Sequence, residues 1–568
     1  MKEKIKNLIK GDVEDSASEL VTHSRDASLF EIKPELVVYP KDIADVSSLV
    51  KFVAEEKKTN PQISITARSA GTCMSGGSLN NSISLDCMRY LNHLDEIKDV
   101  SSYEILPHFW GAKPVVISGE VQVEPGVYYH NFEPKTLEKN LLLPCFTASK
   151  SINAIGGMIG NNSGGELSLK YGKTQDYVRE VEVVFADGTH ESLSEIPRRE
   201  AESRASRPTF VGGIYRDILK LVDDNRTLIE SKRPHVSKNS AGYNLWNVIR
   251  NDEKSGQEMV DLSQLIVGSQ GTLGITVGAK LRLVKTKKES AMLVVYLYDL
   301  NILADLVDEA LKFEPETIET YDDKSILLAV RFWKGFIKMK GIMGFIKMGI
   351  NFLPEFFMLL GGMPKMVLLI ECTGDDKHEV LARIELLQKR LSSFKNIKIK
   401  VAKNKEAGEK YWMIRHDSFN LLRQHVKGKR TAPFIDDVIV PPEKLPEFIP
   451  AIRQILDSHK LNYSIAGHGG NGNFHIIPLI DTDERKSLDM ILEVSEQVYA
   501  LVIRMGGSIT GEHNDGIIRT PYLPEMFGDE MIQLFTQVKK IFDPQNIFNP
   551  GKKVGLTKAD IGKYLIRE

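Results

Sequence analysis

The sequence contains the nine-residue stretch Gly467-His468-Gly469-Gly470-Asn471-Gly472-Asn473-Phe474-His475. Asn471-Gly472 is the pair most favoured in a two-residue type I′ hairpin turn, because both positions need a positive φ. A hairpin centred there places His468 directly opposite His475, and opposed residues share one face with Cβ atoms about 4.5–5.5 Å apart. Two imidazoles on one face can bind a divalent metal at about 2.0–2.1 Å. We therefore predict a metal-binding hairpin; the alternative is a glycine-rich surface hairpin with two incidental histidines.

A second glycine-rich stretch, residues 506–516, supplies a carboxylate and a further histidine, Glu512 and His513. Two histidines and one glutamate are a familiar ligand set for a catalytic metal that keeps an open position. Adjacent residues of a regular strand point to opposite faces, so both side chains reach one site only if the flanking glycines bend the chain. We predict Glu512 as a metal ligand and His513 as a free base. The alternative is a solvated Glu-His pair in a loop.

Length and composition limit the class of protein. The chain has 568 residues, 42% of them hydrophobic and 26% charged, which predicts a globular protein of two or more domains. A net charge of -2 gives no indication of nucleic-acid binding. The four cysteines are scattered without a CxxC pair, which excludes a cysteine-ligated iron–sulfur cluster within this sequence. The first residues lack the apolar core of a signal peptide, so we expect a cytoplasmic protein.

The N-terminal half alternates short strands with small-residue loops. Residues 36–39 predict a strand, and Asp42 can cap the helix that follows it. Residues 63–66 predict another strand, which runs directly into the loop Arg68–Gly77. A strand that feeds such a loop exposes backbone N–H groups, which suits a diphosphate.

Two further glycine-rich loops, Ile155–Gly165 and Gly268–Ile275, allow close backbone approach to a flat or anionic ligand. Three such loops in one region indicate a large cofactor with phosphates and a ring system; the alternative is three unrelated turns. None has the GxGxxG spacing or the lysine of a phosphate-binding loop, which disfavours a nicotinamide-type site.

In combination, these motifs resemble the FAD-dependent 2-hydroxyacid dehydrogenases of the vanillyl-alcohol-oxidase/PCMH flavoprotein superfamily. The resemblance points to the branch that holds the flavin-binding chain of glycolate oxidase and the D-lactate and D-2-hydroxyglutarate dehydrogenases, and it runs from about residue 24 to 552. The matching segments are Arg68–Gly77, Glu124–Val127, Gly156–Gly165 with Tyr171-Gly172, Lys238–Tyr243, Gly268–Ile275, the hairpin, Gly511–His513 and Asn549–Lys552.

The resemblance implies an α+β architecture with non-covalent FAD. It divides the chain into a lead-in (1–29), a bipartite PCMH-type FAD-binding domain (30–285), a cap domain with an antiparallel sheet (286–505) and a segment that returns to the flavin (506–568). No histidine lies between Ala67 and Gly77 or between Ile152 and Gly165, so we expect no covalent link to the flavin. The residues it implies at FAD are Arg68, Ser69, Ala70, Gly71, Thr72, Cys73, Gly77, Pro144, Gly156, Gly157, Gly160, Asn161, Asn162, Gly164, Gly165, Gly271, Gly274, Ile275 and Asn549.

The cap domain carries the implied substrate contacts. Arg415 stands where the family binds the substrate carboxylate, a task that suits a bidentate guanidinium; the alternative is a surface helix arginine. Members specific for D-2-hydroxyglutarate carry a lysine near the start of the segment 434–441, where this chain has Ile435 and Asp436. That departure argues against a dicarboxylate substrate unless Lys427 or Lys429 substitutes for the lysine.

The insertion 331–365 within the cap is apolar with interspersed lysines. Its Pro354 and its charges argue against a membrane-spanning helix. One interpretation is a basic amphipathic segment on an anionic membrane surface, at the inner face of the membrane. The other is an insertion that packs on its own domain or on a partner.

Together these features predict an FAD-dependent dehydrogenase for a small (D)-2-hydroxyacid of the lactate, glycolate or 2-hydroxyglutarate type. A divalent metal on His468, His475 and Glu512, zinc or else manganese or iron, would acidify the hydroxyl, and His513 would take its proton. The electron acceptor would be a separate iron–sulfur protein, an electron-transfer flavoprotein or a quinone. The rival functions are a non-redox transferase resembling alkylglycerone-phosphate synthase and a non-catalytic flavin component of a membrane-associated complex.

Overall fold

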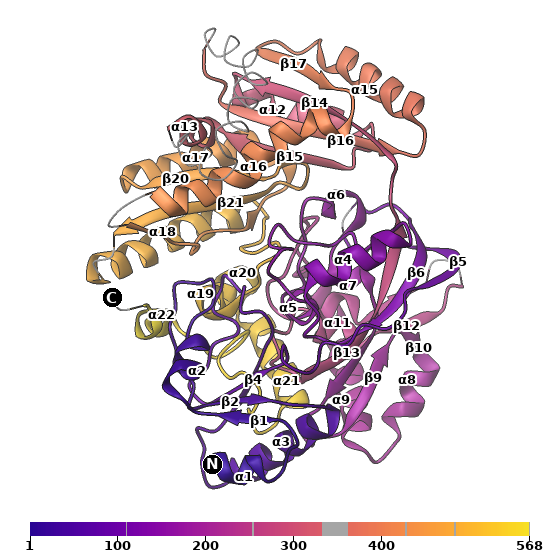
Figure 1. Cartoon of the computed structure of the whole chain (residues 1–568), viewed down its shortest axis with the longest axis vertical. Coiled ribbons are helices and arrows are strands. Elements are labelled where there is room, and N and C mark those ends of the chain that lie inside the picture. Colours follow the sequence, from indigo (N-terminus) through magenta and orange to yellow (C-terminus); the bar gives the residue numbers. More distant parts are fainter. Residues whose placement is uncertain (110, 253–254, 332–361, 426–428, 482–483, 567–568) are drawn as a thin grey trace.

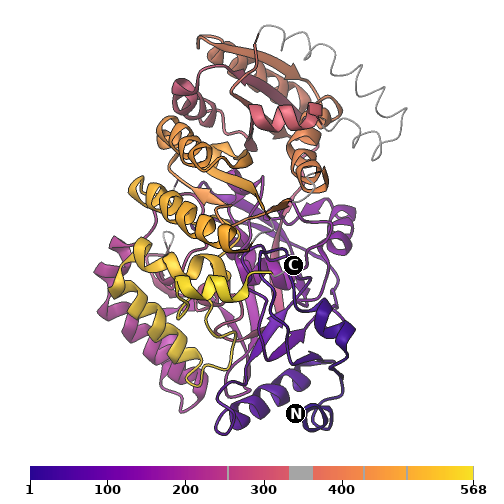
Figure 2. The ribbon, with the colours of Figure 1, turned by 90° about the vertical axis from the view of Figure 1, so that its left-hand side faces the viewer.

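The computed structural model describes residues 1–568 except 110, 253–254, 332–361, 426–428, 482–483 and 567–568. An N-terminal domain fills the lower half of the molecule in Figure 1, a cap domain lies above it, and the C-terminal segment (yellow) returns to the N-terminal domain. Figure 2 shows this return from the side, with the C-terminal helices against the N-terminal domain.

The first sheet of the N-terminal domain carries the strand predicted at residues 36–39. Its order is β1-β2-β4-β3, with β2 and β3 both parallel to β4. The predicted helix after Asp42 is present, and the Asp42 side chain accepts a hydrogen bond from Asp45 N. The strand predicted at 63–66 lies two residues later. The bounds are β1 Asp12–Glu14, β2 Leu36–Tyr39, β3 Ile65–Arg68, β4 Ile83–Asp86 and α3 Ile43–Glu56.

A second sheet with antiparallel pairing forms the other half of this domain, in the order β5-β6-β13-β8-β9, with β7 beside β13. The helix α9 buries an apolar face that includes Ile214, Ile218 and Leu221, and α21 packs on it. The bounds are β5 Lys98–Ile105, β6 Val115–Val123, β7 Leu141–Leu142, β8 Val178–Val184, β9 His190–Ser194, β13 Ile275–Lys285, α4 Tyr129–Glu138, α5 Ile155–Asn161, α6 Ser168–Tyr171, α7 Thr174–Tyr177, α8 Arg198–Ala205, α9 Phe210–Asp224, α10 Arg226–Ser231 and α11 Ser263–Ile266. A small sheet joins β10 Ile196–Pro197, β12 Glu258–Val260 and β11 Ile249–Asn251.

The cap domain is an antiparallel sheet with helices on both faces, in the order β17-β14-β16-β15-β20-β21-β18 with β19 beside β21. Alternate residues of β14 divide between two cores, because successive side chains of a strand point to opposite faces. Leu293 and Val295 belong to the core that contains α12 and α15, whereas Val294 packs with Tyr411 of α16 on the other face. The bounds are β14 Glu289–Leu297, β15 Thr317–Asp322, β16 Met366–Gly374, β17 Ile397–Ala402, β18 Lys429–Thr431, β19 Val438–Ile439, β20 Asn462–His468, β21 Asn473–Asp481, α12 Leu303–Leu311, α13 Asp323–Arg331, α15 Lys377–Leu391, α16 Lys405–His425, α17 Leu445–Ser458 and α18 Glu484–Arg504.

The hairpin between β20 and β21 corrects our predicted register. His468 pairs with Asn473, and His475 pairs with Ala466. The type I′ turn is absent because residues Gly469–Asn471 form a 3-10 turn and only Gly472, at φ 72°, is left-handed. This four-residue connection shifts the pairing by two positions, which is one full side-chain period. His468 and His475 therefore still share one face, as diagonal rather than direct neighbours.

The C-terminal segment is tied to the N-terminal domain by buried hydrogen bonds. Asn549 donates from Nδ2 to the carbonyls of Gly77 and Gln270, at 2.8 and 2.7 Å, and its Oδ1 accepts from Thr66 at 3.0 Å. These partners belong to two of the glycine-rich loops and to β3, so one side chain holds three segments together. The helices of this segment are α19 Gly516–Arg519, α20 Leu523–Phe527, α21 Asp529–Phe542 and α22 Lys558–Tyr564.

No helix among the described residues has the length and apolar character needed to cross a membrane. The predicted basic insertion at 331–365 falls largely outside the described residues, so its two interpretations stay open.

We predict that Asn549→Ala lowers the stability of the chain by about 2 to 4 kcal/mol, because two buried carbonyls lose their donor. The measurement is the midpoint of urea unfolding. The matched control is Asn546→Ala: Asn546 has a similar left-handed backbone, φ 54° against 38° for Asn549, but its side chain is exposed. Equal midpoints for the two variants would mean that the lost hydrogen bonds contribute nothing beyond backbone strain.

Candidate functional site

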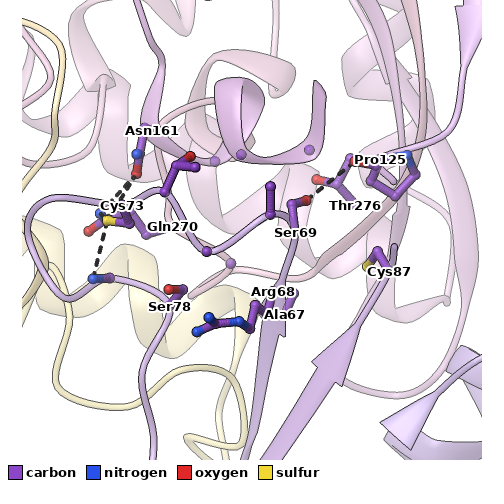
Figure 3. A pocket seen from close by; sticks show the side chains of 18 residues that line it. Ala67, Arg68, Ser69, Cys73, Ser78, Cys87, Pro125, Asn161, Gln270 and Thr276 are labelled. Carbon is purple, nitrogen blue, oxygen red and sulfur yellow. Dashed lines mark hydrogen bonds between the residues drawn. The ribbon is translucent and has the colours of Figure 1, made fainter. Parts of the chain in front are cut away.

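A cavity in the N-terminal domain is lined by the glycine-rich loops (Figure 3). Arg68–Cys73 borders it on one side, α5 on another, and Gln270 and Gly271 on a third. The predicted cofactor residues that line it are Arg68, Ser69, Ala70, Gly71, Thr72, Cys73, Gly77, Gly156, Gly157, Gly160, Asn161 and Gly271. The structure thus brings the three loops together around one space, as a single large ligand requires.

Glycines keep this cavity open. A Cβ at Gly160 would meet no protein atom within 4 Å, and one at Gly157 would meet only Ser69 Cβ at 3.9 Å. Arg68 lines the same cavity, and its Nη1 is buried without a hydrogen-bond partner among the described residues. A buried cationic donor without a partner, beside backbone that a ligand can approach closely, fits the phosphates of FAD.

The other predicted cofactor residues lie around the cavity rather than in its wall. Gly164 and Gly165 lie near Glu512 and Lys238, Asn162 bonds Gln175, and Asn549 supports the loops from behind. Ile275 begins the strand β13 and Gly274 directly precedes it, and Pro144 is buried in the loop after β7. Sequence reasoning missed the lining residues Ala67, Ser78, Cys87, Pro125, Gln270 and Thr276. Pro125 and Gln270 lie in the family-matching segments Glu124–Val127 and Gly268–Ile275, whereas no sequence signal distinguishes the other four.

A second cluster forms where the cap hairpin meets the C-terminal segment. His468 Nε2 lies 3.3 Å from His475 Nε2 and 3.4 Å from Glu512 Oε1, and the cluster's three ligand atoms all lie within 4.8 Å of one another. Ligand atoms about 2.0–2.1 Å from a tetrahedral metal lie roughly 3.3–3.4 Å apart. The geometry of the predicted ligand set therefore fits one divalent cation.

The second nitrogen of each of these rings faces a buried carboxylate. His468 Nδ1 lies 2.5 Å from Glu319 Oε1, and His475 Nδ1 lies 3.1 Å from Asp436 Oδ1. Each carboxylate accepts a hydrogen bond from the Nδ1–H of its ring, so in the neutral rings both Nε2 atoms present a lone pair. Two lone pairs 3.3 Å apart repel each other unless a proton or a metal cation lies between them, which is a second reason why the cluster fits a metal.

Lys238 provides a positive charge beside the third ligand. Its Nζ donates to Glu512 Oε1 at 2.5 Å, and both side chains are buried. Burial would raise the pKa of Glu512, but Lys238 and His468 outweigh burial and hold it well below its usual range. Burial would likewise lower the pKa of His468, but Glu319 raises it. The cluster thus combines an ionised Glu512 carboxylate, paired with Lys238, with a His468 ring whose basicity Glu319 increases.

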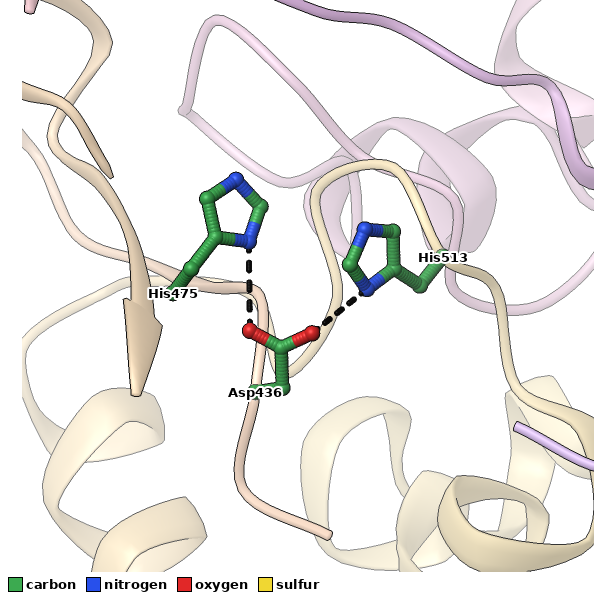
Figure 4. Close-up of side chains that lie close together, drawn as sticks. All are labelled: Asp436, His475 and His513. Atoms are coloured by element: carbon green, nitrogen blue, oxygen red, sulfur yellow. Dashed lines mark hydrogen bonds and ion pairs between the residues drawn. The ribbon is translucent and has the colours of Figure 1, made fainter. Parts of the chain in front are cut away.

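His513 lies beside the cluster, and its ring contacts Asp436, the carboxylate that also contacts His475 (Figure 4). Its Nδ1 forms an ion pair with Asp436 Oδ2 at 2.8 Å, and its ring stacks on His475 with centroids 5.2 Å apart. Burial would lower the pKa of His513, but Asp436 and Asp437 outweigh burial and raise it to about 9. The pKa of the predicted base is therefore higher than the value near neutrality that we expected from a histidine.

Asp437 explains how adjacent residues reach one site. Its Oδ2 accepts hydrogen bonds from the backbone N–H groups of Glu512 and His513, at 2.8 and 2.7 Å, and from Thr510 Oγ1 at 2.7 Å. Because one carboxylate oxygen accepts hydrogen bonds from two successive backbone amides, the chain at Glu512 and His513 bends and does not run as a regular strand. Asp437 itself has a left-handed φ of 68°, which breaks strand alternation and lets it share the site with Asp436.

Arg415 is a buried part of the site rather than a surface arginine. Its side chain is 12% exposed and donates from Nε to Glu319 Oε2 at 3.1 Å, while the other oxygen of Glu319 contacts His468. Glu319 thus engages the Nε edge of the guanidinium, and the Nη groups are the donors suited to a ligand carboxylate. Of the proposed substitutes for the missing lysine, Lys427 lies outside the described residues, and Lys429 pairs through its backbone with Asp481.

Two family models match the chain. Residues 34–194 match the FAD binding domain, and residues 286–553 match the C-terminal domain of FAD linked oxidases. The solved structure of p-cresol methylhydroxylase with substrate bound has a TM-score of 0.62 at 15% identity, covering 97% of this chain and 95% of that chain. This likeness confirms the predicted PCMH-type fold with its cap.

Curated relatives match most of the chain at low identity. D-2-hydroxyglutarate dehydrogenase of Escherichia coli (strain K12) is 28% identical over 557 residues, covering 95% of this chain and 50% of that protein. Glycolate oxidase subunit GlcD of Bacillus subtilis (strain 168) is 25% identical over 544 residues, covering 95% and 93%. The chain thus spans about half the length of the D-2-hydroxyglutarate dehydrogenases that it matches.

We predict that Gly160→Leu abolishes FAD binding without unfolding the chain, because its side chain enters the cavity and not the protein core. The control is Gly213→Leu, in the helix α9, where a Cβ meets only the end of Arg216 at 3.4 Å. The measurement is the flavin absorbance per protein beside the melting temperature. Full FAD content in the Gly160 variant would show that the cavity is not the cofactor site.

Proposed function

We propose that this chain, which belongs to the FAD-linked oxidases, oxidises a small (D)-2-hydroxyacid of the lactate, glycolate or 2-hydroxyglutarate type to the 2-oxoacid. The observation that carries the proposal is the convergence of His468, His475 and Glu512, with a basic histidine and a buried arginine beside them. When bound, FAD accepts a hydride and a divalent cation, zinc or else manganese or iron, acts as a Lewis acid toward the substrate hydroxyl.

The cofactor loops and the metal cluster adjoin each other. A Cβ at Gly164 would lie 3.1 Å from Glu512 Oε1, and Ser75 Oγ donates to the carbonyl of His513 at 3.2 Å. Both contacts join segments implied at FAD to the residues proposed for proton transfer and metal binding. A substrate held at the cluster therefore lies within reach of a flavin held by the loops, which is what hydride transfer needs.

His513 accepts the hydroxyl proton in this proposal. Its Nδ1 is engaged by Asp436, so Nε2 is the nitrogen available to the substrate. The neighbouring carboxylates favour the protonated ring that results, and they thereby stabilise the product of the proton transfer. A cation held by the cluster would oppose this shift by electrostatic repulsion and bring the pKa of His513 down.

Arg415 binds the substrate carboxylate through its Nη groups. Glu319 holds the guanidinium from the other side and also holds His468, so the carboxylate contact and the metal ligand share one support. This arrangement sets the separation between the group that binds the substrate carboxylate and the ligands near its hydroxyl. In a 2-hydroxyacid the hydroxyl is on the carbon next to the carboxylate. With Ile435 fully buried and Asp436 engaged by two histidines, a second substrate carboxylate gains no partner from these two residues.

The electrons leave to a separate acceptor in this proposal: an iron–sulfur protein, an electron-transfer flavoprotein or a quinone. The rival non-redox transferase shares the fold but has no use for a hydroxyl proton acceptor beside a three-ligand metal cluster. Flavin bleaching by a 2-hydroxyacid under anaerobic conditions separates the two functions, since a transferase without net redox leaves the flavin oxidised.

We predict that anaerobic addition of D-lactate, glycolate or D-2-hydroxyglutarate bleaches the flavin and that L-2-hydroxyacids do so far more slowly. In His468→Ala, metal content falls sharply and flavin reduction slows by two or more orders of magnitude, because the developing alkoxide loses its positive partner, an effect of about 3 kcal/mol or more. FAD stays bound, since its loops lie elsewhere. Elemental analysis and stopped-flow absorbance measure both effects.

The control for this variant is His190→Ala, which removes another histidine paired with a carboxylate, Glu182 at 3.2 Å, on the surface of the N-terminal domain. It should keep the normal metal content and the normal rate. A His468→Ala protein that lacks metal but reduces its flavin at the normal rate would make the ion structural and remove it from the mechanism.

We also predict that FAD is held without a covalent bond. Acid precipitation should release all yellow colour into the supernatant, because neither main cofactor loop contains a histidine that could attach to the flavin. Yellow colour that stays with the pellet would contradict this prediction.

A further inference from the structure

We infer that Asp436 is a positioning residue that joins the metal ligand His475 and the base His513 into one unit. The inference rests on the proposed function. It concerns the orientation and the proton positions of the two rings. His475 needs a free lone pair for a cation, and His513 needs one for a proton.

The geometry of Asp436 differs from that of an ordinary buried aspartate. Its side chain is fully buried, and its two oxygens contact two different rings: Oδ1 lies 3.1 Å from His475 Nδ1, and Oδ2 lies 2.8 Å from His513 Nδ1 (Figure 4). The two rings are nearly parallel, with an interplanar angle of 22°. One carboxylate thus sets the rotation of both rings and their separation.

The position of Asp436 is itself fixed. Its backbone carbonyl accepts a hydrogen bond from Arg519 Nη2 at 2.5 Å, and the fully buried Arg519 also donates to the carbonyl of Asn514 at 3.0 Å. The next residue, Asp437, holds the backbone of Glu512 and His513. One aspartate therefore fixes the side chains of this unit and the other fixes its backbone.

The carboxylate also sets which ring nitrogens carry protons. Both Nδ1 atoms face a carboxylate, which has no hydrogen of its own: His475 Nδ1 is hydrogen-bonded to Oδ1, and His513 Nδ1 forms an ion pair with Oδ2. Each Nδ1 therefore carries the proton of its ring. In the neutral rings the Nε2 of His475 is left with a lone pair toward His468 and Glu512, and the Nε2 of His513 is left with a lone pair for a substrate proton. Asp436 thus determines the tautomers that ligation and base catalysis need.

Replacing Asp436 by asparagine therefore has a specific consequence. An amide has one acceptor oxygen and one donor NH₂, so it can accept from only one of the two Nδ1–H groups. The other ring must turn its lone pair toward the amide and carry its proton on Nε2. If that ring is His475, the metal ligand is lost; if it is His513, the base is lost. Both functions cannot survive together.

The experiment compares wild type, Asp436→Asn and Asp322→Asn as purified flavoproteins. Zinc affinity is measured by competition with a chromogenic chelator, and kcat and KM are measured with the hydroxyacid that bleaches wild type best. Asp322 is a matched control, because it is a fully buried cap aspartate whose contacts are Ser325 and Arg453, away from the cluster. That variant should keep wild-type zinc affinity, kcat and KM.

For Asp436→Asn we expect one of two results. Either zinc affinity falls tenfold to a hundredfold, or zinc affinity holds and kcat falls at least a hundredfold while KM changes less than threefold, since Arg415 is untouched. In both cases FAD content and melting temperature stay near wild type. Zinc affinity and kcat that both remain within twofold of wild type would overturn the inference.

Asp436→Ser keeps the inference testable if the asparagine variant fails to fold. Serine carries one side-chain oxygen where aspartate has two, so it cannot keep the separate contacts of Oδ1 and Oδ2 with the two rings. The same loss in zinc affinity or kcat is therefore expected, and wild-type values for both would overturn the inference. Failure of the proposed function looks different, because wild type itself would then bind no metal or leave its flavin oxidised with every hydroxyacid. A wild type that is active, beside an unaffected Asp436→Asn, rejects the inference alone.

Discussion

The contact on which the candidate site depends is the approach of two imidazole nitrogens, His468 Nε2 and His475 Nε2, to 3.3 Å. Neighbouring nitrogens that both carry lone pairs repel each other, so the contact is stable only with a positive charge between them. The surrounding residues hold the two rings in place, so that they do not rotate or move apart to reduce this repulsion. Glu319 and Asp436 hold the far side of each ring, and Glu512 adds a negative charge 3.4 Å from the first nitrogen. Such a site is organised for a cation before one arrives, and preorganisation of this kind lowers the cost of binding.

The convergence of His468 and His475 could be predicted from sequence because the two histidines are local. Our turn type was wrong, but the register moved by two residues, and a shift by an even number keeps side chains on the same face. A shift by one residue would have sent one histidine to the other side of the sheet. The prediction that the two histidines share a face therefore required only that the register shift be an even number of residues, and it did not require the correct turn type. The glycine loops could be predicted for a similar reason, since each is a continuous run whose backbone exposure follows from its composition.

The supporting residues could not be predicted in the same way. Glu319 comes from β15, Asp436 from the loop before β19, and Lys238 from the N-terminal domain, and nothing in the sequence around each one states which side chain it will meet. Lys238 belongs to a segment that matches the family, but its contact with Glu512 spans 274 positions of sequence. In the sequence, Asp436 stands out only as the replacement of an expected lysine. Its role becomes visible only when the strand, the hairpin and the C-terminal segment are folded together.

The C-terminal segment joins the two halves of the protein at the candidate site. Asn549 secures it to the loops around the cofactor cavity, while Asp437 of the cap secures its Gly511–His513 stretch through the Gly511, Glu512 and His513 amides. Asn514 adds a direct link, since its Nδ2 donates to the carbonyls of Asn161 and Gly268, one from each of two cofactor loops. Glu512 and His513 are thus held by the cap on one side and by the cofactor loops on the other. The distance from Glu512 and His513 to the cavity is therefore set by hydrogen bonds to both domains and not by domain packing alone.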